Sequence, residues 1–263
     1  MQEKLHYMHL DENYFDQNIL EKMGKSFDSI HIGLLRGDCL VRVVDMDGWS
    51  HDKLKHFNRS LKQTVGEFPY IIKNALDNKR PNLRPYSWYT EEDCLKSALV
   101  MSGSEVKLSN HNYLYHLVHH KALPLIESIL YQAIPEITSV KNSGSFIYPP
   151  DEGMMSWHTN ESLSPTPVRV YFVYSPEDRK SYFRYIGLDG RVYTSWDRKG
   201  WNIRAFHCGS LQVDGYRLWH CVMSNTHRFS FGFRLTGIAM DQLGFMAKEF
   251  DAGYMNIEGW RAW

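Results

Sequence analysis

The sequence predicts an α+β protein in which a mostly helical N-terminal region, residues 1–140, precedes an antiparallel β-sandwich. Three observations carry this prediction. From about residue 143 the hydrophobic pattern alternates with a period of two, which is typical of half-buried strands. About eight such runs follow one another, and the Asp189-Gly190 dipeptide separates two of them as a tight hairpin turn does. Apolar residues make up 43% of the 263 residues, enough for a substantial core.

The first half of the chain mixes patterns. Residues 28–48 are rich in β-branched side chains and punctuated by Gly and Asp, which predicts two short strands or a hairpin. Ser50 stands where it can cap a following helix. Thr90, with Asp93 three residues later, resembles a capping box ahead of another helix.

A longer helical stretch is expected over residues 112–134, where Pro124 starts a second helix or kinks the first. On a helix, His116, His119 and His120 would share one face. No acid completes this group as a metal site, so we interpret it as a solvated helix face.

The second half predicts strands at regular spacing. They are expected at residues 143–149, 153–159, 167–174, 181–188, 191–197, 201–208, 217–223 and 227–235. Eight short antiparallel strands of this kind predict a jelly roll or a related double-sheet sandwich. The tail over 241–263 is less regular. Because no low-complexity linker separates them, we expect residues 1–140, the core at 141–240 and the tail to form a single fused unit.

Composition excludes several functional classes. Thirty basic and thirty acidic residues cancel, which leaves no basic stripe for nucleic acid and no polybasic helix for a membrane surface. No apolar stretch approaches the roughly 20 residues needed to cross a bilayer, and the N-terminus lacks the layout of a signal peptide. Four scattered cysteines contain no CxxC pair. We therefore expect a cytoplasmic protein with reduced thiols that acts on a small molecule.

The strand at 227–235 carries the most chemical information. Its alternation places Arg228, Ser230, Gly232 and Arg234 on one face and apolar side chains on the other. Two arginines and a serine fit a sandwich interior poorly unless a ligand carboxylate meets them. A guanidinium grips a carboxylate through two parallel hydrogen bonds, to which Ser230 can add a third, and Gly232 leaves room for the ligand.

Two histidines complete this pattern. His220 lies eight residues before Arg228, and His158 lies far upstream, followed two positions later by Asn160. Histidines at adjacent strand ends, beside an arginine that grips a carboxylate, predict a metal ion with a bound keto acid.

The residues that carry a family resemblance stand in this order: Tyr148-Pro-x-x-x-Gly153, His158-x-Asn160, His220, and Arg228-x-Ser230. Over roughly residues 140–237 the pattern resembles the iron(II)- and 2-oxoglutarate-dependent oxygenase superfamily. That resemblance implies a double-stranded β-helix, a cupin-like jelly roll. More loosely, the same region is similar to uncharacterised oxygenase-like proteins of marine bacteria and their phages. The chain has His-x-Asn where the superfamily usually has His-x-Asp.

The resemblance implies roles for individual residues. His158 and His220 would ligate iron(II), and Arg228 with Ser230 would hold the 5-carboxylate of 2-oxoglutarate. Tyr148 stands where many members place a tyrosine that hydrogen-bonds this co-substrate.

The resemblance also implies the cofactors Fe(II), 2-oxoglutarate and O2, whose reaction yields succinate, carbon dioxide and an oxidant that removes a substrate hydrogen. Arg169 and Arg234 are weaker candidates for the same co-substrate or for an acidic substrate.

Asn160 leaves three interpretations open, because an amide oxygen is neutral and a poorer iron ligand than a carboxylate. The preferred one is a hydroxylase that works with two histidines and water. The second is a halogenase with halide at the vacated iron position, although halogenases of the superfamily carry a smaller residue there. The third recruits Glu161 or Asp151 as the acid.

A different class of function also fits the missing acid: a non-catalytic jelly-roll module that binds a sugar or small acid. Other features are interpreted more plainly. Trp196 and Trp201 line a substrate pocket or belong to the core, and Cys221 is expected to be a buried apolar side chain on the opposite side from His220.

Overall fold

The computed structural model describes residues 6–36, 42–45, 70–73, 112–113, 115–118, 122–150, 153–158, 160, 168–189, 191–209, 218–250 and 252–255. The helices are α1 (Gln17–Arg36) and α4 (Ala122–Ala133), with short 3-10 helices η1 (Glu12–Tyr14) and η4 (Asp241–Met246). The strands before the predicted sandwich are β1 (Tyr7–Leu10), β2 (Arg42–Asp45), β3 (Tyr70–Lys73), β4 (Asn112–Tyr113) and β5 (Tyr115–Val118).

Eight strands follow and form the centre of the molecule. They are β6 (Ser139–Tyr148), β7 (Gly153–His158), β8 (Val168–Ser175), β9 (Ser181–Ile186), β10 (Val192–Trp196), β11 (Gly200–His207), β12 (His220–Ser224) and β13 (Arg228–Thr236). Two short strands, β14 (Ala247–Lys248) and β15 (Ala252–Met255), come after them. Each of the eight strands expected from the alternating pattern is present.

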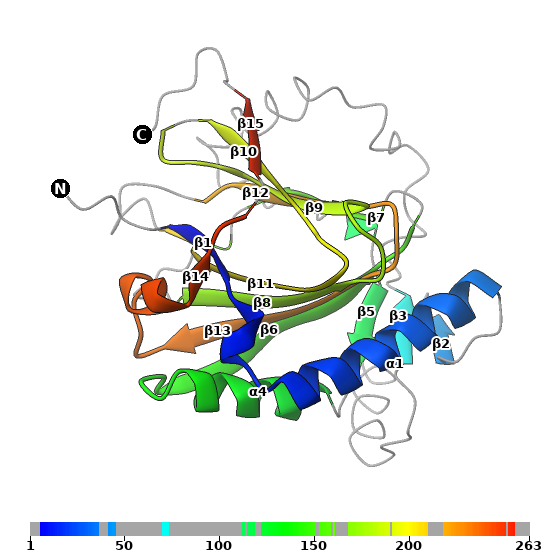
Figure 1. Ribbon diagram of the computed structural model, residues 1–263. Coiled ribbons are helices and arrows are strands. Elements are labelled where there is room, and N and C mark those ends of the chain that lie inside the picture. The colour runs from blue at the N-terminus through cyan, green and yellow to red at the C-terminus, as the bar shows by residue number, and fades with distance from the viewer. Residues whose placement is uncertain are drawn as a thin grey trace, which may run out of the picture.

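Two sheets face each other, with α1 and α4 beneath the larger one (Figure 1). The nine-stranded sheet has the order β14-β1-β11-β8-β13-β6-β5-β3-β2, and the six-stranded sheet has the order β15-β10-β9-β12-β7-β4. The pairings are antiparallel apart from β2 with β3. Counted from one to eight, β6 to β13 stand in the orders 6-3-8-1 and 5-4-7-2, a regular jelly-roll alternation between two sheets. β9 and β10 are antiparallel neighbours, as the Asp189-Gly190 turn predicts.

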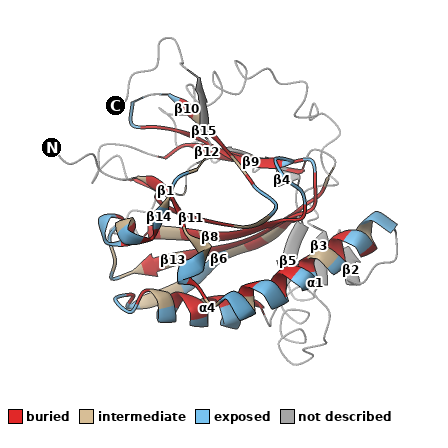
Figure 2. Ribbon diagram, viewed as in Figure 1, coloured by how far each residue is buried: buried red, intermediate tan, exposed pale blue. Residues whose placement is uncertain are grey.

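The outer face of the nine-stranded sheet forms a core with the helices. The Asp16 carboxylate accepts hydrogen bonds from the backbone N–H groups of Asn18 and Ile19, which caps α1. Along α1, buried apolar side chains recur on one stripe, and Phe27 in that stripe stacks on Phe229 of β13 with ring centroids 4.7 Å apart. The helix faces against the sheet are accordingly buried, and their opposite faces are exposed (Figure 2).

The inner face of the same sheet meets the six-stranded sheet across a second, aromatic core. The buried members of this core are Tyr7, Tyr148, Phe183, Tyr185, Phe206, Cys208, Leu218 and Val222. Because Phe229, Phe231, Phe233 and Leu235 belong to the helix-side core, alternation turns Arg228, Ser230, Gly232 and Arg234 into the sandwich. The polar stripe of β13 therefore faces the interior between the sheets.

Several expectations for the first half need correction. Residues 28–36 belong to α1 rather than to a hairpin, because the stripe that continues through Ile30 packs on the sheet. The predicted helix over 112–134 begins only at Ala122; the pairing of β4 with β7, and of β5 with β3 and β6, makes the preceding segments strands. Pro124 lies in the first turn of α4, where its missing N–H costs nothing.

The histidine face expected on that helix does not form, because His116 lies in strand β5. His119 and His120 lie outside the described residues, as do Ser50, Thr90 and Asp93 with the helices they were expected to begin. Where the structure describes residues 1–138, it shows α1, α4, the short helix η1 and the strands β1 to β5. The expectation that residues 1–140 are mostly helical stays a prediction for the rest of that region.

Candidate active site

Strand pairing brings the two predicted metal-ligating histidines together. His158 ends β7 and His220 begins β12, and the Cα atoms of the two residues are partners in the antiparallel register of the six-stranded sheet. The β12 register shifts directly after His220, and the other neighbour of His220 is Tyr185 on β9. The pairing therefore holds residues 62 positions apart side by side at one end of the sandwich.

The His220 ring has a defined orientation. It is buried between Phe183 and Phe206, with ring centroids 5.2 and 5.4 Å away. Nδ1 lies 2.9 Å from the backbone carbonyl of Leu218, so it carries the proton and donates it. Nε2 is then the acceptor, and it lies 3.0 Å from the side-chain amide nitrogen of Asn160. The lone pair of Nε2 points to the residue that replaces the usual acid.

This arrangement suits a metal ligand in part. A histidine that binds a metal through one ring nitrogen usually donates its other N–H to a carbonyl or carboxylate, as His220 does to Leu218. Among the described residues, however, no three His, Cys, Asp or Glu side chains gather closely enough to hold a metal. The described side chains that meet at this point are the His220 imidazole and the Asn160 amide. Glu161 and Asp151, the alternative acids, lie outside the described residues.

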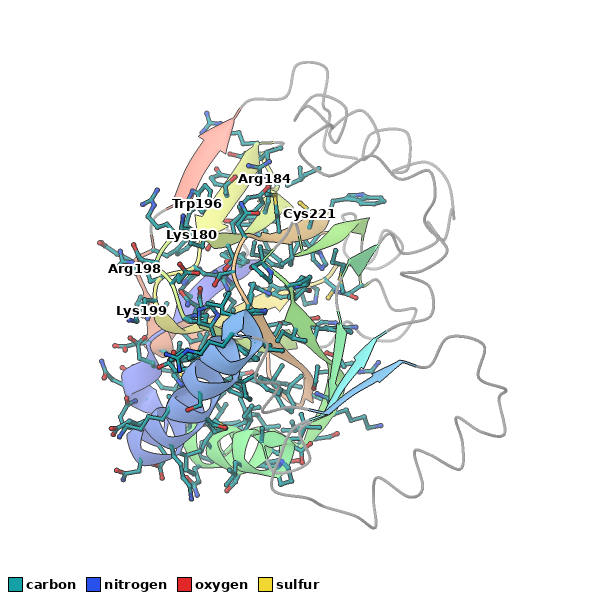
Figure 3. The ribbon with its side chains drawn as sticks, turned by 90° about the vertical axis from the view of Figure 1, so that its right-hand side faces the viewer. Lys180, Arg184, Trp196, Arg198, Lys199 and Cys221 are labelled. Atoms are coloured by element: carbon teal, nitrogen blue, oxygen red, sulfur yellow. The ribbon has the colours of Figure 1, made fainter. Side chains whose placement is uncertain are left out.

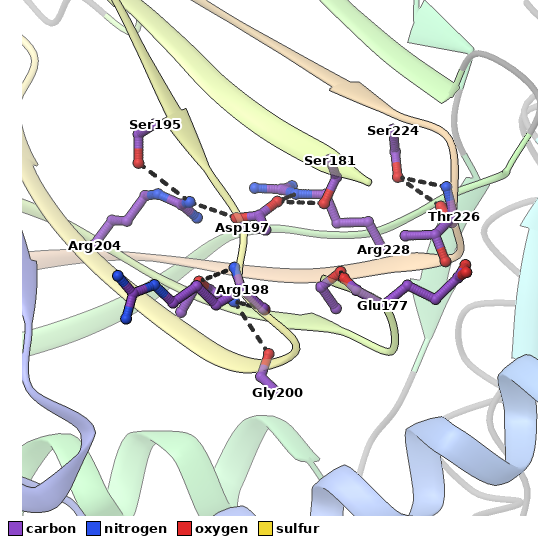
Figure 4. A network of polar contacts seen from close by, with 12 residues as sticks. Glu177, Ser181, Ser195, Asp197, Arg198, Gly200, Arg204, Ser224, Thr226 and Arg228 are labelled. Carbon is purple, nitrogen blue, oxygen red and sulfur yellow. Dashed lines mark hydrogen bonds and ion pairs between the residues drawn. The ribbon is translucent and has the colours of Figure 1, made fainter. Parts of the chain in front are cut away.

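Arg228 lies in a buried ion cluster that sequence reasoning did not foresee. Its Nε donates to the Asp197 carboxylate over 2.8 Å, and Ser181 donates to the same oxygen. The other Asp197 oxygen accepts from Arg204 (Figure 4). Asp197 is fully buried; burial raises its pKa, but the two guanidinium groups outweigh burial and hold the pKa well below its usual range.

The cluster carries one positive charge in excess, because two guanidinium groups share one carboxylate. Arg204 and Arg228 are 0% and 2% exposed, so water does not balance that charge. Nη1 of each arginine is buried without a hydrogen-bond partner in the described part of the chain. Each of these buried N–H groups could donate to an anion bound in the interior. Arg228 was expected to hold a carboxylate through two parallel hydrogen bonds. Because Nε already donates to Asp197, only the Nη groups remain for such a ligand.

Tyr148 and Ser230 lie near Arg228 on the inner face of the larger sheet. Tyr148 is the register partner of Arg228 on β6, and its ring centroid lies 5.1 Å from the guanidinium carbon. Burial raises the pKa of Tyr148, which keeps its hydroxyl protonated. Ser230 is buried one inward position farther along β13. Tyr148, Arg228 and Ser230 thus share one wall of the interior.

The cluster extends to the N-terminal strand. Arg204 donates through Nε to the Tyr7 hydroxyl over 2.9 Å, and Nε2 of His9 lies 2.7 Å from the Ser195 hydroxyl. Burial and the nearby Arg204 charge lower the pKa of His9 to about 2, so this imidazole is neutral. β1 therefore adds polar groups to the cluster without adding charge.

Arg169 and Arg234 are brought together at the other end of the same sheet. They are register partners on β8 and β13, and both are half-buried. Arg169 hydrogen-bonds the Tyr171 hydroxyl and the Cys208 thiol. The space expected above Gly232 is filled, because a Cβ there would lie 2.7 Å from the Tyr171 ring. The expectation that Gly232 makes room for a ligand is therefore wrong: it makes room for Tyr171.

Trp201, Trp196 and Cys221, which the sequence singled out, pack against neighbouring core and sheet residues. Trp201 packs on Phe27 and donates to the Leu20 carbonyl, which puts it in the helix-side core. Trp196 packs edge-on against Tyr182, and Cys221 is buried on the same sheet (Figure 3).

Asp197, Arg204 and Ser181 are the functional candidates that sequence reasoning missed. A signal was present in Arg204, a charged residue in the middle of the predicted strand 201–208. Asp197 ends the predicted strand 191–197 and resembles an ordinary turn residue, so only the fold reveals its role.

Comparison with known proteins finds similarity only to solved structures. No family model and no curated protein matches the chain. A prolyl hydroxylase from Trichoplax adhaerens, solved with a peptide fragment of hypoxia inducible factor, is 13% identical over 49% of this chain and 61% of its own, with a TM-score of 0.34. This match spans less than two thirds of that protein.

Two further solved structures are similar at the same level. A prolyl-4-hydroxylase from Pseudomonas putida is 11% identical over 88% of this chain and 91% of its own, with a TM-score of 0.36. An oxidoreductase of the 2OG-Fe(II) oxygenase family from Burkholderia pseudomallei is 10% identical over 75% and 95%, with a TM-score of 0.33. TM-scores this low do not establish a shared fold. No helix in the described part of the chain is long and apolar enough to span a membrane.

Proposed function

We propose that this protein is an iron(II)- and 2-oxoglutarate-dependent oxygenase that hydroxylates an unactivated C–H bond of a small molecule. His158 and His220 would hold the metal, with Asn160 at the position of the usual acid. Arg228, Ser230 and Tyr148 would hold the far carboxylate of 2-oxoglutarate. When bound, iron, 2-oxoglutarate and O2 supply the oxidising chemistry.

One observation carries this proposal: a pair of histidines and a buried, under-neutralised arginine cluster lie in the same jelly-roll sandwich. From His220 to Ser224 strand β12 advances about 13 Å, and Ser224 lies next to Ser181 of the cluster. His220 carries its proton on Nδ1, which leaves Nε2 as the nitrogen that can bind a metal, and Nε2 faces Asn160. The orphaned Nη1 of Arg228 and the excess charge favour an anion in the interior.

The residues around His220 and Arg228 fix the orientation of these two side chains. The Leu218 carbonyl fixes the His220 tautomer, and Phe183 and Phe206 fix its ring plane and exclude water. Asp197 holds Arg228 in one orientation through Nε, so that its remaining N–H groups are fixed in place. Such an arrangement orients a dicarboxylate without rearrangement of the wall.

Asn160 favours hydroxylation over halogenation. Its side chain lies against Nε2 of His220, so the position beside the metal ligand is filled by an amide. A halide needs that position empty. We therefore expect a hydroxylated product when chloride or bromide is present, and a halogenated product detected by mass spectrometry would reverse this preference.

Succinate formation tests the oxygenase proposal against the non-catalytic binding module. With iron(II), ascorbate, 2-oxoglutarate and oxygen, the protein is expected to form succinate, and His220→Gln is expected to form none. His31→Gln is the matched control, because His31 lies on α1 outside the sandwich. Absence of both succinate and metal binding in the unaltered protein would favour the binding module.

Metal affinity tests the ligand assignment without turnover. Asn160→Asp adds a negative charge beside His220, so we expect it to strengthen Mn(II) binding at least tenfold in calorimetry. His220→Gln should abolish that binding. If Asn160→Asp leaves Mn(II) affinity unchanged, Asn160 does not stand beside the metal.

The co-substrate assignment is tested at Arg228. Arg228→Met removes at least one charged hydrogen bond of about 1.5–3 kcal/mol, which predicts about a 10- to 150-fold higher requirement for 2-oxoglutarate. The fold should survive, because Asp197 keeps its bond to Arg204. Arg184→Met is the control, because Arg184 lies on β9 of the smaller sheet, where its register partners are Cys221 and Thr194. An unchanged requirement in Arg228→Met would mean that another residue holds the carboxylate.

A further inference from the structure

Three cationic residues lie side by side across the nine-stranded sheet. Arg234 of β13 is the register partner of Lys141 on β6 and of Arg169 on β8. Directly opposite residues in antiparallel strands have Cβ atoms about 4.5–5.5 Å apart and share a face. Lys141, Arg234 and Arg169 therefore form one row, which we call the cation row.

The cation row faces the interior side of the sheet. Leu235 and Val168, the neighbours of Arg234 and Arg169 along their strands, are buried in the helix-side core, and Val140 packs against that core. Alternation then turns the three cationic side chains the other way. Lys141 is exposed, while Arg234 and Arg169 are half-buried, so the row runs from solvent into the sandwich.

Nothing in the described part of the chain balances the charge of this row. None of its three residues forms an ion pair with a described acid. Nε of Arg169 and Nε of Arg234 are buried without hydrogen-bond partners among the described residues. Like charges directly opposite one another destabilise a sheet. An arrangement that costs folding energy and leaves donors unpaired is typical of a ligand site.

The row lies beside the proposed metal site. Phe206 of β11 is the register partner of Arg169, and the Phe206 ring centroid is 5.4 Å from that of His220. Phe206 thus neighbours Arg169 through strand pairing and His220 across the sandwich. A group held by the cation row would place the rest of its molecule next to the histidine pair.

The row is separate from the Arg228 cluster. The Tyr171 ring covers Gly232, which lies between Ser230 and Arg234 on the inward face of β13. Tyr171 also stacks on Phe206, with ring centroids 5.2 Å apart. This aromatic layer divides the inner face of the sheet into two cationic regions, so each needs its own anion.

We propose that the cation row of Lys141, Arg234 and Arg169 binds a phosphate monoester group of the substrate. Three cations match a dianion better than a single carboxylate, which would leave two positive charges unbalanced. A phosphate monoester carries about −1.5 to −2 charge at neutral pH and offers three acceptor oxygens to the two guanidinium forks. This assignment names a substrate class for the proposed oxygenase and rests on that proposal, but anion binding by the row does not require turnover.

The test uses inorganic phosphate as the probe and protein thermal stability as the readout. Phosphate that binds the folded protein raises the unfolding temperature with increasing concentration, while acetate at the same ionic strength should raise it less. We expect Arg234→Gln and Arg169→Gln each to weaken phosphate binding roughly 10- to 100-fold. Lys199→Gln is the control: Lys199 lies in the turn before β11, about 20 Å along that strand from Phe206 (Figure 3).

The outcomes separate this inference from the oxygenase proposal. Weakened phosphate binding in the row variants, with an unchanged 2-oxoglutarate requirement for succinate formation, supports both. Phosphate binding that depends on the row in a protein that forms no succinate supports the row and refutes the oxygenase. Equal phosphate binding in the unaltered protein and both row variants overturns the inference. A higher 2-oxoglutarate requirement in Arg234→Gln would also overturn it, because the cation row would then be the co-substrate site. Tight, length-dependent binding of single-stranded oligonucleotides would overturn it as well.

Discussion

The buried Asp197 carboxylate gives the sharpest test of the ion cluster. Asp197→Asn keeps the shape of the side chain but leaves Arg204 and Arg228 as two buried guanidinium groups with no counter-charge. Loss of one partner from a buried ion pair costs about 3–5 kcal/mol. With a urea m-value of roughly 3 kcal/mol/M, the unfolding midpoint should fall by about 1–1.7 M.

Equilibrium unfolding in urea, followed by tryptophan fluorescence, measures this change. The control is Glu21→Gln, which breaks a solvent-exposed pair with Lys25 on α1 and should leave the urea midpoint nearly unchanged. A midpoint shift below about 0.3 M in Asp197→Asn would refute the argument, because the two guanidinium groups would then need no carboxylate. We also expect 2-oxoglutarate to stabilise Asp197→Asn more than the unaltered protein, since the variant frees Nε of Arg228.

Two further predictions concern stability. Burial lowers the pKa of His9 to about 2, so the folded protein favours the neutral imidazole. This contribution to the free energy of unfolding is fully present above the unfolded pKa of about 6.5 and is lost as the pH falls towards 2. Between pH 6.5 and pH 4.5 this loss is about 2 kcal/mol, and urea titrations of His9→Gln should show a flatter pH profile over that range. Phe27→Ala removes the ring that stacks on Phe229 and should cost about 3–5 kcal/mol; a loss under 1 kcal/mol would mean that α1 does not anchor the sheet.

The strands of the sandwich were predictable, whereas the helix at residues 28–36 and the strands at 112–118 were not. Alternation with a period of two is decisive where one face of a strand meets a core, as in β13 with Phe229, Phe231 and Phe233 on one side. In α1 the β-branched Ile30 and Ile32 and the helical Gly33 suggested strands locally, yet packing on the sheet overrode that preference.

The strands that carry His158, His220 and Arg228 could be predicted from the sequence, but the charge balance around Arg228 could not. The roles of these three residues stay a prediction that rests on the polar stripe of β13 and on the family resemblance. The sharing of Arg228 with Asp197 depends on a contact across 31 residues between two sheets, which spacing cannot show. The same holds for Tyr171, whose ring fills the space above Gly232 from a neighbouring strand.

The N-terminal strand β1 has a practical consequence. It hydrogen-bonds along β11, is itself covered by β14, and sends Tyr7 and His9 into the interior. A shortened protein that begins after Leu10 would expose the backbone N–H and C=O groups of β11 as a free sheet edge, which invites pairing between molecules. Truncations that remove β1 therefore risk aggregation.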